Sequence, residues 1–419
     1  MHLRYRQSCR GCGSTSLTPV IDLGEQFIQG AFLKPGTQPP TLRRIPLRLF
    51  RCDPTKDQSA CGLLQTSVTV PPEILYSTYW YRSGTNATMR DHLSAIAKEA
   101  AELTHSDHAA VLDIGCNDGT LLRAYPPSFK RFGVDPSNAI DAIGPEITAI
   151  QDIFPSDELN ARLEGKKLDI ITSIAMFYDL EDPISFVRAI KSALAPDGVW
   201  IFEMSYMPSM LRTNSYDTIC HEHLEYYSLA VIEFILGRAG MKIFRASLNG
   251  INGGSIRCYA THTDNFHYKS QADAEAMAQL RNGEFDLALD SDAPYRDFQA
   301  RVERHRDELT KLIKDLKREG KRIHVYGAST KGNVILQFCG IDNNLIDYAA
   351  DRNPDKNGAR TIGSNIPIIS EEESRAMHPD YYLVLPWHFR EEFLTRERKT
   401  IEAGSRFIFP LPDIEIVGP

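Results

Sequence analysis

A histidine-rich segment near the middle of the chain carries residue types that could do acid–base chemistry. It is Y-D-T-I-C-H-E-H-L-E-Y-Y-S-L, from Tyr216 to Leu229. Two histidines around a glutamate could suggest a metal site, but positions two apart diverge on a helix and the nearby sequence offers no third ligand. A histidine titrates near neutrality, so His223 could remove a proton from a carbon beside a carbonyl, with Glu222 or Glu225 orienting its ring. The alternative is a helix-start cap with buried histidines.

Four of the eight cysteines fall within the first 61 residues, and this clustering favours a metal over disulfides in a cytosolic chain. C-R-G-C-G, with Cys9 and Cys12, is a knuckle in which glycines let backbone amides turn toward two thiolates. The second pair, Cys52 and Cys61, is separated by eight residues, whereas a zinc ribbon usually closes with another short C-x-x-C. We predict a structural zinc on these four cysteines, with unliganded thiols as the alternative.

The glycine-containing segment that begins at Ala109 is the strongest local signal. A-A-V-L-D-I-G-C-N-D-G-T-L-L reads as a short apolar strand, a turn and a helix start, and the next strand ends at Asp135. This pattern predicts a nucleotide-binding βαβ unit. Gly115 and Gly119 would let the backbone approach a ligand, and Asp135 would accept hydrogen bonds from ribose hydroxyls.

The same turn, D-x-G-x-x-x-G with Asp113 first, is similar to motif I of class I S-adenosylmethionine-dependent methyltransferases. A dinucleotide site would prefer G-x-G-x-x-G. Asp152 falls where that family keeps an acid for the adenine amino group. A nucleotide-binding fold with another ligand is the alternative. The resemblance implies cofactor contacts from the following residues: Asp113, Gly115, Asn117, Asp118, Gly119, Asp135, Asp152, Ser173 and Ala175.

A second nucleotide-fold unit lies near the carboxyl end. R-I-H-V-Y-G-A-S-T-K-G-N-V-I-L reads again as strand, tight turn and helix start, and the following strand ends at Asp351, which suggests an internal duplication. The turn from Gly327 to Asn333 offers amides and Lys331 to an anion such as a nucleoside diphosphate, with a scaffolding role as the alternative. Before it, the apolar stripe of residues 274–318 predicts a packing helix.

Two loops could border a ligand site. N-G-I-N-G-G-S-I-R, from Asn249 to Arg257, predicts a glycine-rich hairpin entering a strand. Such a segment is usually only a turn, but a planar guanidinium suits phosphate oxygens, so Arg257 could pair with a diphosphate. Near the end of the chain, Trp387 and His388 follow a buried strand and could line the same cleft.

In combination, these motifs resemble the three-domain sugar C-methyltransferases of deoxysugar biosynthesis. The resemblance covers nearly the whole chain and implies an α/β fold: a class I methyltransferase Rossmann-like domain, an N-terminal zinc-ribbon-like module and a second, C-terminal Rossmann-like domain. The expected boundaries are 1–72, 73–245 and 246–419. The implied cofactors are S-adenosylmethionine and structural zinc, and the implied substrate is a nucleotide-linked 4-keto-deoxysugar between the middle and C-terminal domains.

The resemblance also assigns catalytic roles. His223 matches the base that removes a proton alpha to the C-4 ketone, supported by Glu222, and the Tyr-rich segment around Tyr79 and Tyr81 closes over the ligands. Core packing at a domain junction is the alternative for these tyrosines.

Two positions depart from the family pattern, and both lie near the reacting sugar by the analogy. Cys220 stands where a tyrosine is usual, and Tyr178 stands where a loop histidine is usual. These departures leave the accepting carbon and the sugar open. The candidate substrate contacts are His221, Asn252, Arg257, Ser329, Lys331 and Asn333.

Composition limits the partners. The 419 residues suit about three domains, and 42% hydrophobic with 24% charged residues is usual for soluble chains. A net charge of −8 argues against nucleic acid. No secretory signal or membrane-spanning stretch is evident, so we expect a cytoplasmic enzyme with a small-molecule substrate; the oligomeric state stays open. An O-methyltransferase, a non-catalytic binding module and, least favoured, a dehydrogenase are the alternatives.

Overall fold

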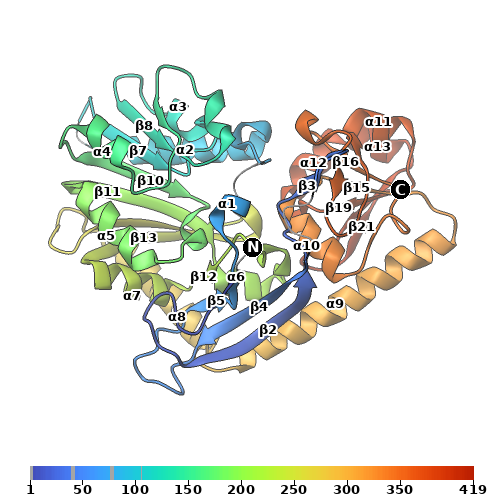
Figure 1. The fold of residues 1–419 in the computed structure, drawn as a ribbon, viewed down its shortest axis with the longest axis horizontal. Helices are drawn as coiled ribbons and strands as arrows, with labels where there is room; N and C mark the ends of the chain where they lie inside the picture. The colour runs from blue at the N-terminus through green and yellow to red at the C-terminus, as the bar shows by residue number, and fades with distance from the viewer. Residues whose placement is uncertain (1–2, 39–42, 76–79, 105) are drawn as a thin grey trace.

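The protein consists of two lobes side by side, with the N-terminal strands lying below and between them (Figure 1). The computed structural model describes residues 3–38, 43–75, 80–104 and 106–419. A long helix, α9 (Ala293–Arg318), leaves the first lobe and runs along the base of the second. Among the described residues, no helix is both long and apolar enough to cross a bilayer.

The first lobe is built on a seven-stranded sheet in the order β13-β14-β11-β10-β7-β8-β9. Strands β7 to β11 are parallel, and β14 is antiparallel to both of its neighbours. Strand order reverses between β7 and β10, which opens a crevice at their carboxyl ends. The strands are β7 (Ala110–Ile114), β8 (Lys130–Val134), β9 (Thr148–Ile150), β10 (Leu168–Ile174), β11 (Leu194–Ser205), β13 (Met241–Asn249) and β14 (Ser255–His262).

Capped helices flank this sheet. Asn86, Asp182 and Ser228 each accept a hydrogen bond from a backbone N–H in the first turn of the helix that follows, which satisfies donors that the helix itself leaves unpaired. The helices of this lobe are α2 (Ala87–Glu102), α3 (Thr120–Arg123), α4 (Asp157–Leu163), α5 (Pro183–Ala193), α6 (Met207–Arg212), α7 (Leu229–Ala239) and α8 (Gln271–Asp286). The expected boundary at residues 245/246 falls within β13.

The N-terminal strands connect the two lobes. A four-stranded sheet in the order β12-β5-β4-β2 includes β12 (Glu225–Tyr226) from the first lobe, and β3 (Phe32–Leu33) pairs with β17 (Arg360–Thr361) of the second. The other elements here are β1 (Arg4–Tyr5), β2 (Leu17–Gln26), β4 (Ile45–Cys52), β5 (Leu64–Thr66), β6 (Val68–Thr69) and α1 (Pro72–Leu75).

The second lobe is a six-stranded sheet in the order β18-β16-β15-β19-β20-β21, with only β21 antiparallel within this described sheet. Its strand order reverses between β15 and β19. At this point a Cβ on Gly327, whose φ is +82°, would come within 2.5 Å of Pro386, so the tight turn requires glycine. The elements are β15 (Ile323–Tyr326), α10 (Thr330–Phe338), β16 (Tyr348–Asp351), β18 (Ile368–Ser370), α11 (Glu371–Ala376), β19 (Tyr381–Val384), α12 (Arg390–Arg396), α13 (Arg398–Glu402), β20 (Arg406–Phe409) and β21 (Glu415–Val417).

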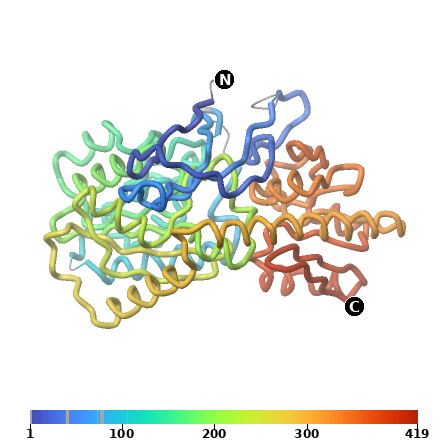
Figure 2. Tube along the Cα trace, turned by 90° about the horizontal axis from the view of Figure 1, so that it is seen from below, coloured from blue at the N-terminus to red at the C-terminus, as the bar shows by residue number. Residues whose placement is uncertain are grey.

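The helical stretch predicted for residues 274–318 is present as two helices, α8 and α9, because the chain turns between them (Figure 2). The apolar stripe of α9, including Val302, Leu309 and Ile313, is buried against β2 and the core of the second lobe. Short 3-10 helices complete the structure: η1 (Ser83–Thr85), η2 (Asn138–Ala142), η3 (Phe177–Asp179), η4 (Tyr216–Thr218), η5 (Ile251–Gly253), η6 (Pro354–Lys356) and η7 (Trp387–Phe389).

Candidate active site

The glycine turn after β7 lies at the first crevice. Gly115 and Gly119 have φ values of +72° and +74°, a conformation that favours glycine. A Cβ on Gly115 would come 3.3 Å from the Met176 side chain in the loop after β10. The turn therefore presents bare backbone at the point where the strand order reverses, which is where doubly wound sheets bind ligands.

Carboxylates at the ends of β8 and β9 complete this cradle. Asp135 accepts hydrogen bonds from the N–H of Asn117 at 2.8 Å and from the N–H and hydroxyl of Ser137 at 2.8 and 2.5 Å. An ionised carboxylate has about four acceptor positions, so one remains for a ribose hydroxyl. Asp152 is exposed, and the neighbouring Ile153 is 57% exposed, although it is apolar. The carboxylate acceptors and the open apolar side chain fit the nucleoside part of a cofactor. Only its exposure identifies Ile153, so sequence reasoning missed this residue.

The remaining residues predicted to contact the cofactor lie deeper. Asp113 is buried, accepts a hydrogen bond from the Thr172 hydroxyl at 2.6 Å, and has its pKa raised to about 7 by burial. Ser173 does not face the crevice, because its hydroxyl accepts a hydrogen bond from the Trp200 indole in the core at 3.0 Å. The Ser173 hydroxyl is therefore used in the core, and contact of this residue with the cofactor through its backbone stays a prediction. Ala175, with φ +56°, places its backbone at the crevice.

Residues 81–84, which precede α2, are hydrogen-bonded to the glycine turn. Asn117 accepts a hydrogen bond from the N–H of Ser83 at 3.0 Å and donates one to the carbonyl of Tyr81 at 3.1 Å. Asp118 accepts one from the N–H of Gly84 at 2.8 Å. The side chains of Asn117 and Asp118 thus hold this segment beside the cofactor cradle, and the Tyr81 side chain is 45% exposed.

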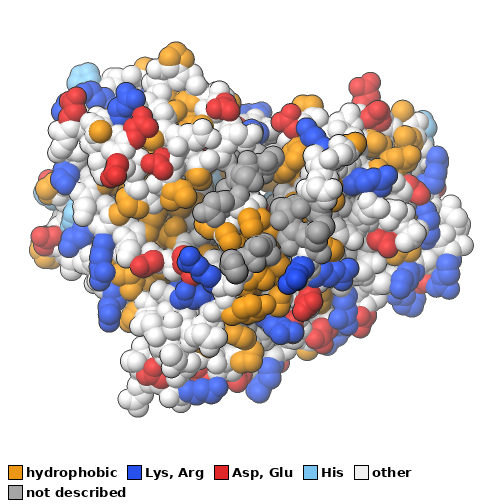
Figure 3. All heavy atoms as spheres, in the orientation of Figure 1, with side chains coloured by type: hydrophobic (Ala, Val, Ile, Leu, Met, Phe, Trp, Pro, Cys, Tyr) orange, Lys and Arg blue, Asp and Glu red, His pale blue; other side chains and the backbone are white. Residues whose placement is uncertain are grey.

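The same segment reaches the second lobe. The carbonyl of Trp80 accepts a hydrogen bond from the Asn353 side chain at 2.9 Å. The Trp80 ring packs edge-on against the Phe32 ring, with centroids 5.8 Å apart. Tyr79 lies outside the described residues. On the face seen in Figure 3, apolar side chains gather between the two lobes. The predicted closing segment therefore contacts both lobes at their junction.

His223 is held in one tautomer. Its Nδ1 lies 2.7 Å from the carbonyl oxygen of Thr218. Because a carbonyl only accepts, Nδ1 carries the ring hydrogen, and Nε2 keeps a lone pair. Among the described residues, none forms a hydrogen bond to Nε2. Burial and the nearby charge of Lys331 lower the pKa of His223 to about 3, so the half-buried ring is neutral and can accept a proton.

The glutamates expected to orient His223 do not do so. Glu225 accepts a hydrogen bond from the Tyr227 hydroxyl at 2.5 Å, and the ring nitrogen of His223 that needs an acceptor is already taken by Thr218. Glu222 is buried, and burial raises its pKa to about 7. The orienting group is thus a backbone carbonyl, supplied by the turn of η4, and sequence reasoning had no side-chain signal by which to find it.

The two positions that depart from the family pattern both lie in this region. Tyr178 follows β10, and its ring centroid is 4.1 Å from that of His223. Cys220 is fully buried, and burial raises the pKa of its thiol, which keeps it neutral. Tyr178 is therefore placed beside the base, while Cys220 is part of the packing around it.

Two residues predicted to contact the substrate form hydrogen bonds with the N-terminal part of the chain. His221 is buried, with Nδ1 2.9 Å from Gln29 Oε1 and Nε2 3.3 Å from the carbonyl oxygen of Ile45. Asn333 is also buried, and its amide donates to the carbonyl of Gln29 at 2.7 Å. Burial lowers the pKa of His221 to about 4. His221 uses both ring nitrogens within the protein, whereas Asn333 Oδ1 has no hydrogen-bond partner among the described residues, so contact of Asn333 with the substrate stays a prediction.

Arg257 is likewise engaged inside the first lobe. Its guanidinium donates to Glu203 at 2.8 Å and to Glu99 at 3.2 Å. Glu203 is buried and also bonds to His92 at 2.6 Å and Asn249 at 2.9 Å. A buried carboxylate needs such partners. The predicted pairing of Arg257 with a diphosphate is therefore replaced by a structural cluster that anchors the hairpin around η5.

The second lobe contributes residues from its own crevice. Lys331, in the first turn of α10, donates to the carbonyl of Asn252 in the first lobe at 2.8 Å. Ser329 is the N-cap of α10. From η7, the Trp387 indole donates to the buried carboxylate of Asp217 at 2.9 Å. Lys331, Ser329 and Asn252 are thus at the junction of the lobes, where Asp217 is an additional residue that sequence reasoning missed.

The four N-terminal cysteines form a metal-binding arrangement. Their Sγ atoms all lie within 4.8 Å of one another, with Cys9 and Cys61 at 3.5 Å and Cys12 and Cys52 at 3.4 Å. A tetrahedral zinc with bonds of about 2.3 Å would separate its sulfurs by about 3.8 Å. The unusually long spacing is accommodated by a loop that Asp53 folds through hydrogen bonds to Thr55 and Thr18. The site fits zinc with four thiolates.

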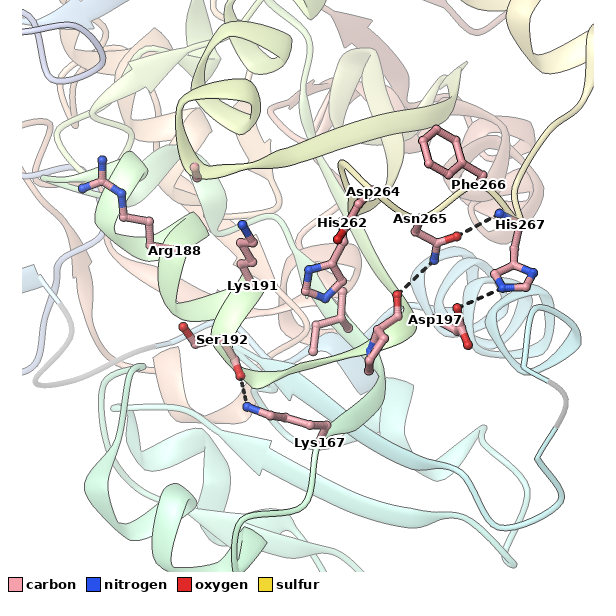
Figure 4. Close-up of a pocket in the computed structure, with 13 residues that line it drawn as sticks. Lys167, Arg188, Lys191, Ser192, Asp197, His262, Asp264, Asn265, Phe266 and His267 are labelled. Atoms are coloured by element: carbon pink, nitrogen blue, oxygen red, sulfur yellow. Dashed lines mark hydrogen bonds and ion pairs between the residues drawn. The ribbon is translucent and has the colours of Figure 1, made fainter.

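A separate groove lies at the other end of the strands of the first sheet, where β10 and β11 begin (Figure 4). Its volume is about 1080 Å³. Lys167 bonds to the carbonyl of Ser192 at 2.5 Å, and His267 pairs with Asp197 at 3.1 Å. The groove contains no residue of the predicted site and is open at the amino ends of the parallel strands, so it is distinct from the crevice described above.

Three family models match successive parts of the chain. Residues 9–76 match "Putative zinc binding domain", residues 81–245 match "Methyltransferase domain", and residues 250–412 match "C-methyltransferase C-terminal domain". The order agrees with the cysteine cluster, the glycine turn and the second lobe.

Individual proteins show similarity over different lengths. The chain is 27% identical to the C-methyltransferase NovU of Streptomyces niveus over 99% of this chain and 98% of that protein. A malonyl-[acyl-carrier protein] O-methyltransferase of Porphyromonas gingivalis is 27% identical over 34% of this chain and 53% of its own length. The crystal structure of an S-adenosylmethionine-dependent methyltransferase from Clostridium acetobutylicum matches with 14% identity and a TM-score of 0.33, covering 41% and 92% of the two chains.

Proposed function

Because the chain is an S-adenosylmethionine-dependent methyltransferase of the C-methyltransferase family, we propose that it methylates a carbon of a nucleotide-linked 4-keto-deoxysugar, with His223 as the base. The observation that carries this proposal is the state of His223. Its ring is neutral, half-buried and fixed by Thr218 at the junction of the lobes, and Nε2 has no hydrogen-bond partner within the described part of the chain. That is the arrangement a proton-accepting base requires.

The residues of the first lobe would hold the cofactor. The bare backbone at Gly115 and the carboxylate of Asp135 suit its nucleoside and amino acid parts, and the segment over the turn limits access of water. When bound, S-adenosylmethionine supplies a methyl group on a positively charged sulfur, which an electron-rich carbon attacks. The metal site of the N-terminal module lies among four thiolates that fill a zinc coordination sphere, so its role is structural.

His223 would begin the reaction on the sugar. Nε2 takes the proton from the carbon next to the ketone, and the electrons of that C–H bond form a carbon–carbon double bond while the carbonyl oxygen becomes an enolate. Tyr178, whose ring is 4.1 Å from His223, limits the positions that the sugar can take. Holding the carbon in line with the methyl group supplies much of the rate enhancement.

The second crevice supports a nucleotide-linked substrate. It has the same strand–turn–helix organisation as the first, and α10 begins with its N-cap at Ser329 facing the junction that also contains Asn252. A helix N-terminus with free N–H groups favours an anion such as a diphosphate. The chain would therefore hold cofactor and sugar nucleotide in separate crevices with His223 between them.

The test uses S-adenosylmethionine carrying carbon-13 in its methyl group and a panel of nucleotide-linked 4-ketosugars. NMR of the product distinguishes a methyl on carbon, which we expect, from a methoxy group. The variant His223→Asn should lower the transfer rate by roughly 100-fold or more while cofactor affinity stays within about twofold. His108→Asn is the matched control and should keep full activity, because this exposed histidine precedes β7 and so lies at the end of the strand away from the glycine turn.

Three outcomes would contradict the proposal. A methoxy product would make the enzyme an O-methyltransferase, and an active His223→Asn protein would exclude this residue as the base. Cofactor binding without transfer to any ketosugar would exclude this substrate class.

A further inference from the structure

Lys331 crosses from the second lobe to the segment that fixes His223. Its ammonium donates a hydrogen bond to the carbonyl of Asn252 at 2.8 Å, and α10 packs against η4. The residue after Asn252 lies against Trp387, since a Cβ on Gly253 would come 2.9 Å from that ring. Lys331 is therefore placed on the first lobe, beside η4.

Two adjacent residues, Asp217 and Thr218, contact Trp387 and His223 respectively. Asp217 accepts a hydrogen bond from Trp387 at 2.9 Å, and the carbonyl of Thr218 holds His223 at 2.7 Å. The positive charge of Lys331 contributes to lowering the pKa of His223. The negative charge of Asp217 acts to raise the pKa of Lys331. Lys331 is thus bonded to η5, His223 is held by η4, and helix α10, which carries Lys331, packs against η4.

A cation beside a general base weakens that base unless negative charge develops nearby during the reaction. Proton removal next to a ketone places that charge on the carbonyl oxygen, two bonds away from the carbon that loses its proton. In a pyranose, C-4 lies across the ring from C-1, which carries the diphosphate. A cation close to His223 is therefore better placed for the ketone oxygen than for the diphosphate.

Lys331 also has hydrogen-bonding capacity to spare. An ammonium has three donors, and within the described residues one is used, by the carbonyl of Asn252. The second carboxylate oxygen of buried Asp217 has no hydrogen-bond partner among these residues, so Asp217 balances the charge without occupying the remaining donors. Those donors are available to a substrate oxygen.

We propose that Lys331 is a catalytic residue that binds the ketone oxygen and stabilises the enolate while His223 takes the proton. This role rests on the proposed function. As the C–H bond breaks, its electron pair forms the carbon–carbon double bond, and the carbonyl π pair moves to the oxygen beside Lys331. When the carbon attacks the methyl group, the carbonyl forms again and the sulfur keeps the electron pair of its broken bond.

The test separates proton removal from methyl transfer and from nucleotide binding. The wild-type protein is incubated in D₂O with a nucleotide-linked 4-ketosugar and S-adenosylhomocysteine, which has no methyl group to transfer, and NMR follows deuterium entry beside the ketone. Lys331→Met should lower exchange at saturating sugar nucleotide by roughly 100-fold, the cost of losing one oxyanion donor. The Kd for nucleoside diphosphate alone should stay within about threefold.

Two further variants keep the test decisive. Lys331→Arg retains the positive charge on a side chain of different shape. It should exchange deuterium beside the ketone faster than Lys331→Met, even if the latter is poorly folded. Lys314→Met, at an exposed position of α9, is the matched control and should exchange like the wild type.

The opposite pattern would overturn the role. If Lys331→Met binds nucleoside diphosphate at least tenfold more weakly but exchanges normally at saturation, Lys331 serves the diphosphate. Exchange in the wild type followed by transfer to carbon supports the proposed function independently of the variants. Absence of exchange with every ketosugar contradicts that function and this role together.

Discussion

The indole N–H of Trp387 donates a hydrogen bond to Asp217 Oδ2 at 2.9 Å, and this bond joins the second lobe to the turn that holds His223. Asp217 is fully buried, and burial raises its pKa. The bond therefore satisfies a buried carboxyl and fixes the distance between the lobes at the site.

Replacing Trp387 with Phe should destabilise the protein. The substitution leaves Asp217 without its indole donor in a buried place, which costs about 1–3 kcal/mol. Denaturant unfolding measures the loss, and methyl transfer should fall as well because the lobes are held less firmly. In an Asp217→Leu background, the same substitution should cost much less; an equal cost in both backgrounds would show that the bond itself contributes little.

Loss of one cysteine should release the metal. We expect Cys12→Ser to contain much less than one equivalent of zinc and to unfold at a lower temperature, because three thiolates leave the tetrahedral site incomplete. Elemental analysis and thermal unfolding measure the two effects. Cys339→Ser changes a buried cysteine outside the cluster and should keep its zinc. Equal zinc content in both variants would show that these sulfurs do not bind it.

Removing Arg257 should affect stability and not nucleotide recognition. Arg257→Met leaves buried Glu203 without its guanidinium partner, and breaking a buried pair costs roughly 3–5 kcal/mol. The Kd for nucleoside diphosphate, measured on the folded fraction, should change less than threefold. A large rise in Kd without loss of stability would restore the diphosphate role expected from the sequence.

The buried carboxyl of Glu225 should make stability depend on pH. Burial raises its pKa to about 8 from the ordinary 4.5, so the folded state binds this proton more tightly than the unfolded state. The free energy of unfolding should therefore fall as pH rises from about 4.5 to about 8. Glu225→Gln should be more stable than the wild type above pH 8, on the order of 2 kcal/mol, and similar near pH 5.

Unfolding curves in urea across this pH range measure the difference between the two proteins. Parallel pH profiles for wild type and Glu225→Gln would mean that this carboxyl is ionised in the folded protein. Glu222, with a pKa raised to about 7, acts in the same direction and remains in both proteins.

The sequence allows prediction of those features that local patterns determine. Strand, glycine turn and acid recur with the right spacing around Gly115 and Gly327, and both turns occur as predicted. Directions of polar side chains depend on distant partners. Arg257 meets Glu203, and Asn333 meets the carbonyl of Gln29, pairings that no local pattern indicates.

The orientation of His223 illustrates the same limit. Its partner is the backbone oxygen of Thr218, and every residue has such an oxygen, so composition and spacing cannot single it out. Ser173 shows a related limit: a small polar residue at the end of a buried strand can face the crevice or the core, and the bond from the Trp200 indole places its hydroxyl in the core.

Strand β3 has a consequence for how the protein is made. Its residues Phe32 and Leu33 pair with Thr361 and Arg360, which leave the ribosome long after them. This pairing cannot form until residue 361 has emerged, and pairings between residues so distant in sequence slow folding. A gene fragment that ends before residue 360 would yield a protein with an unmatched strand at its amino end, prone to pairing with other chains.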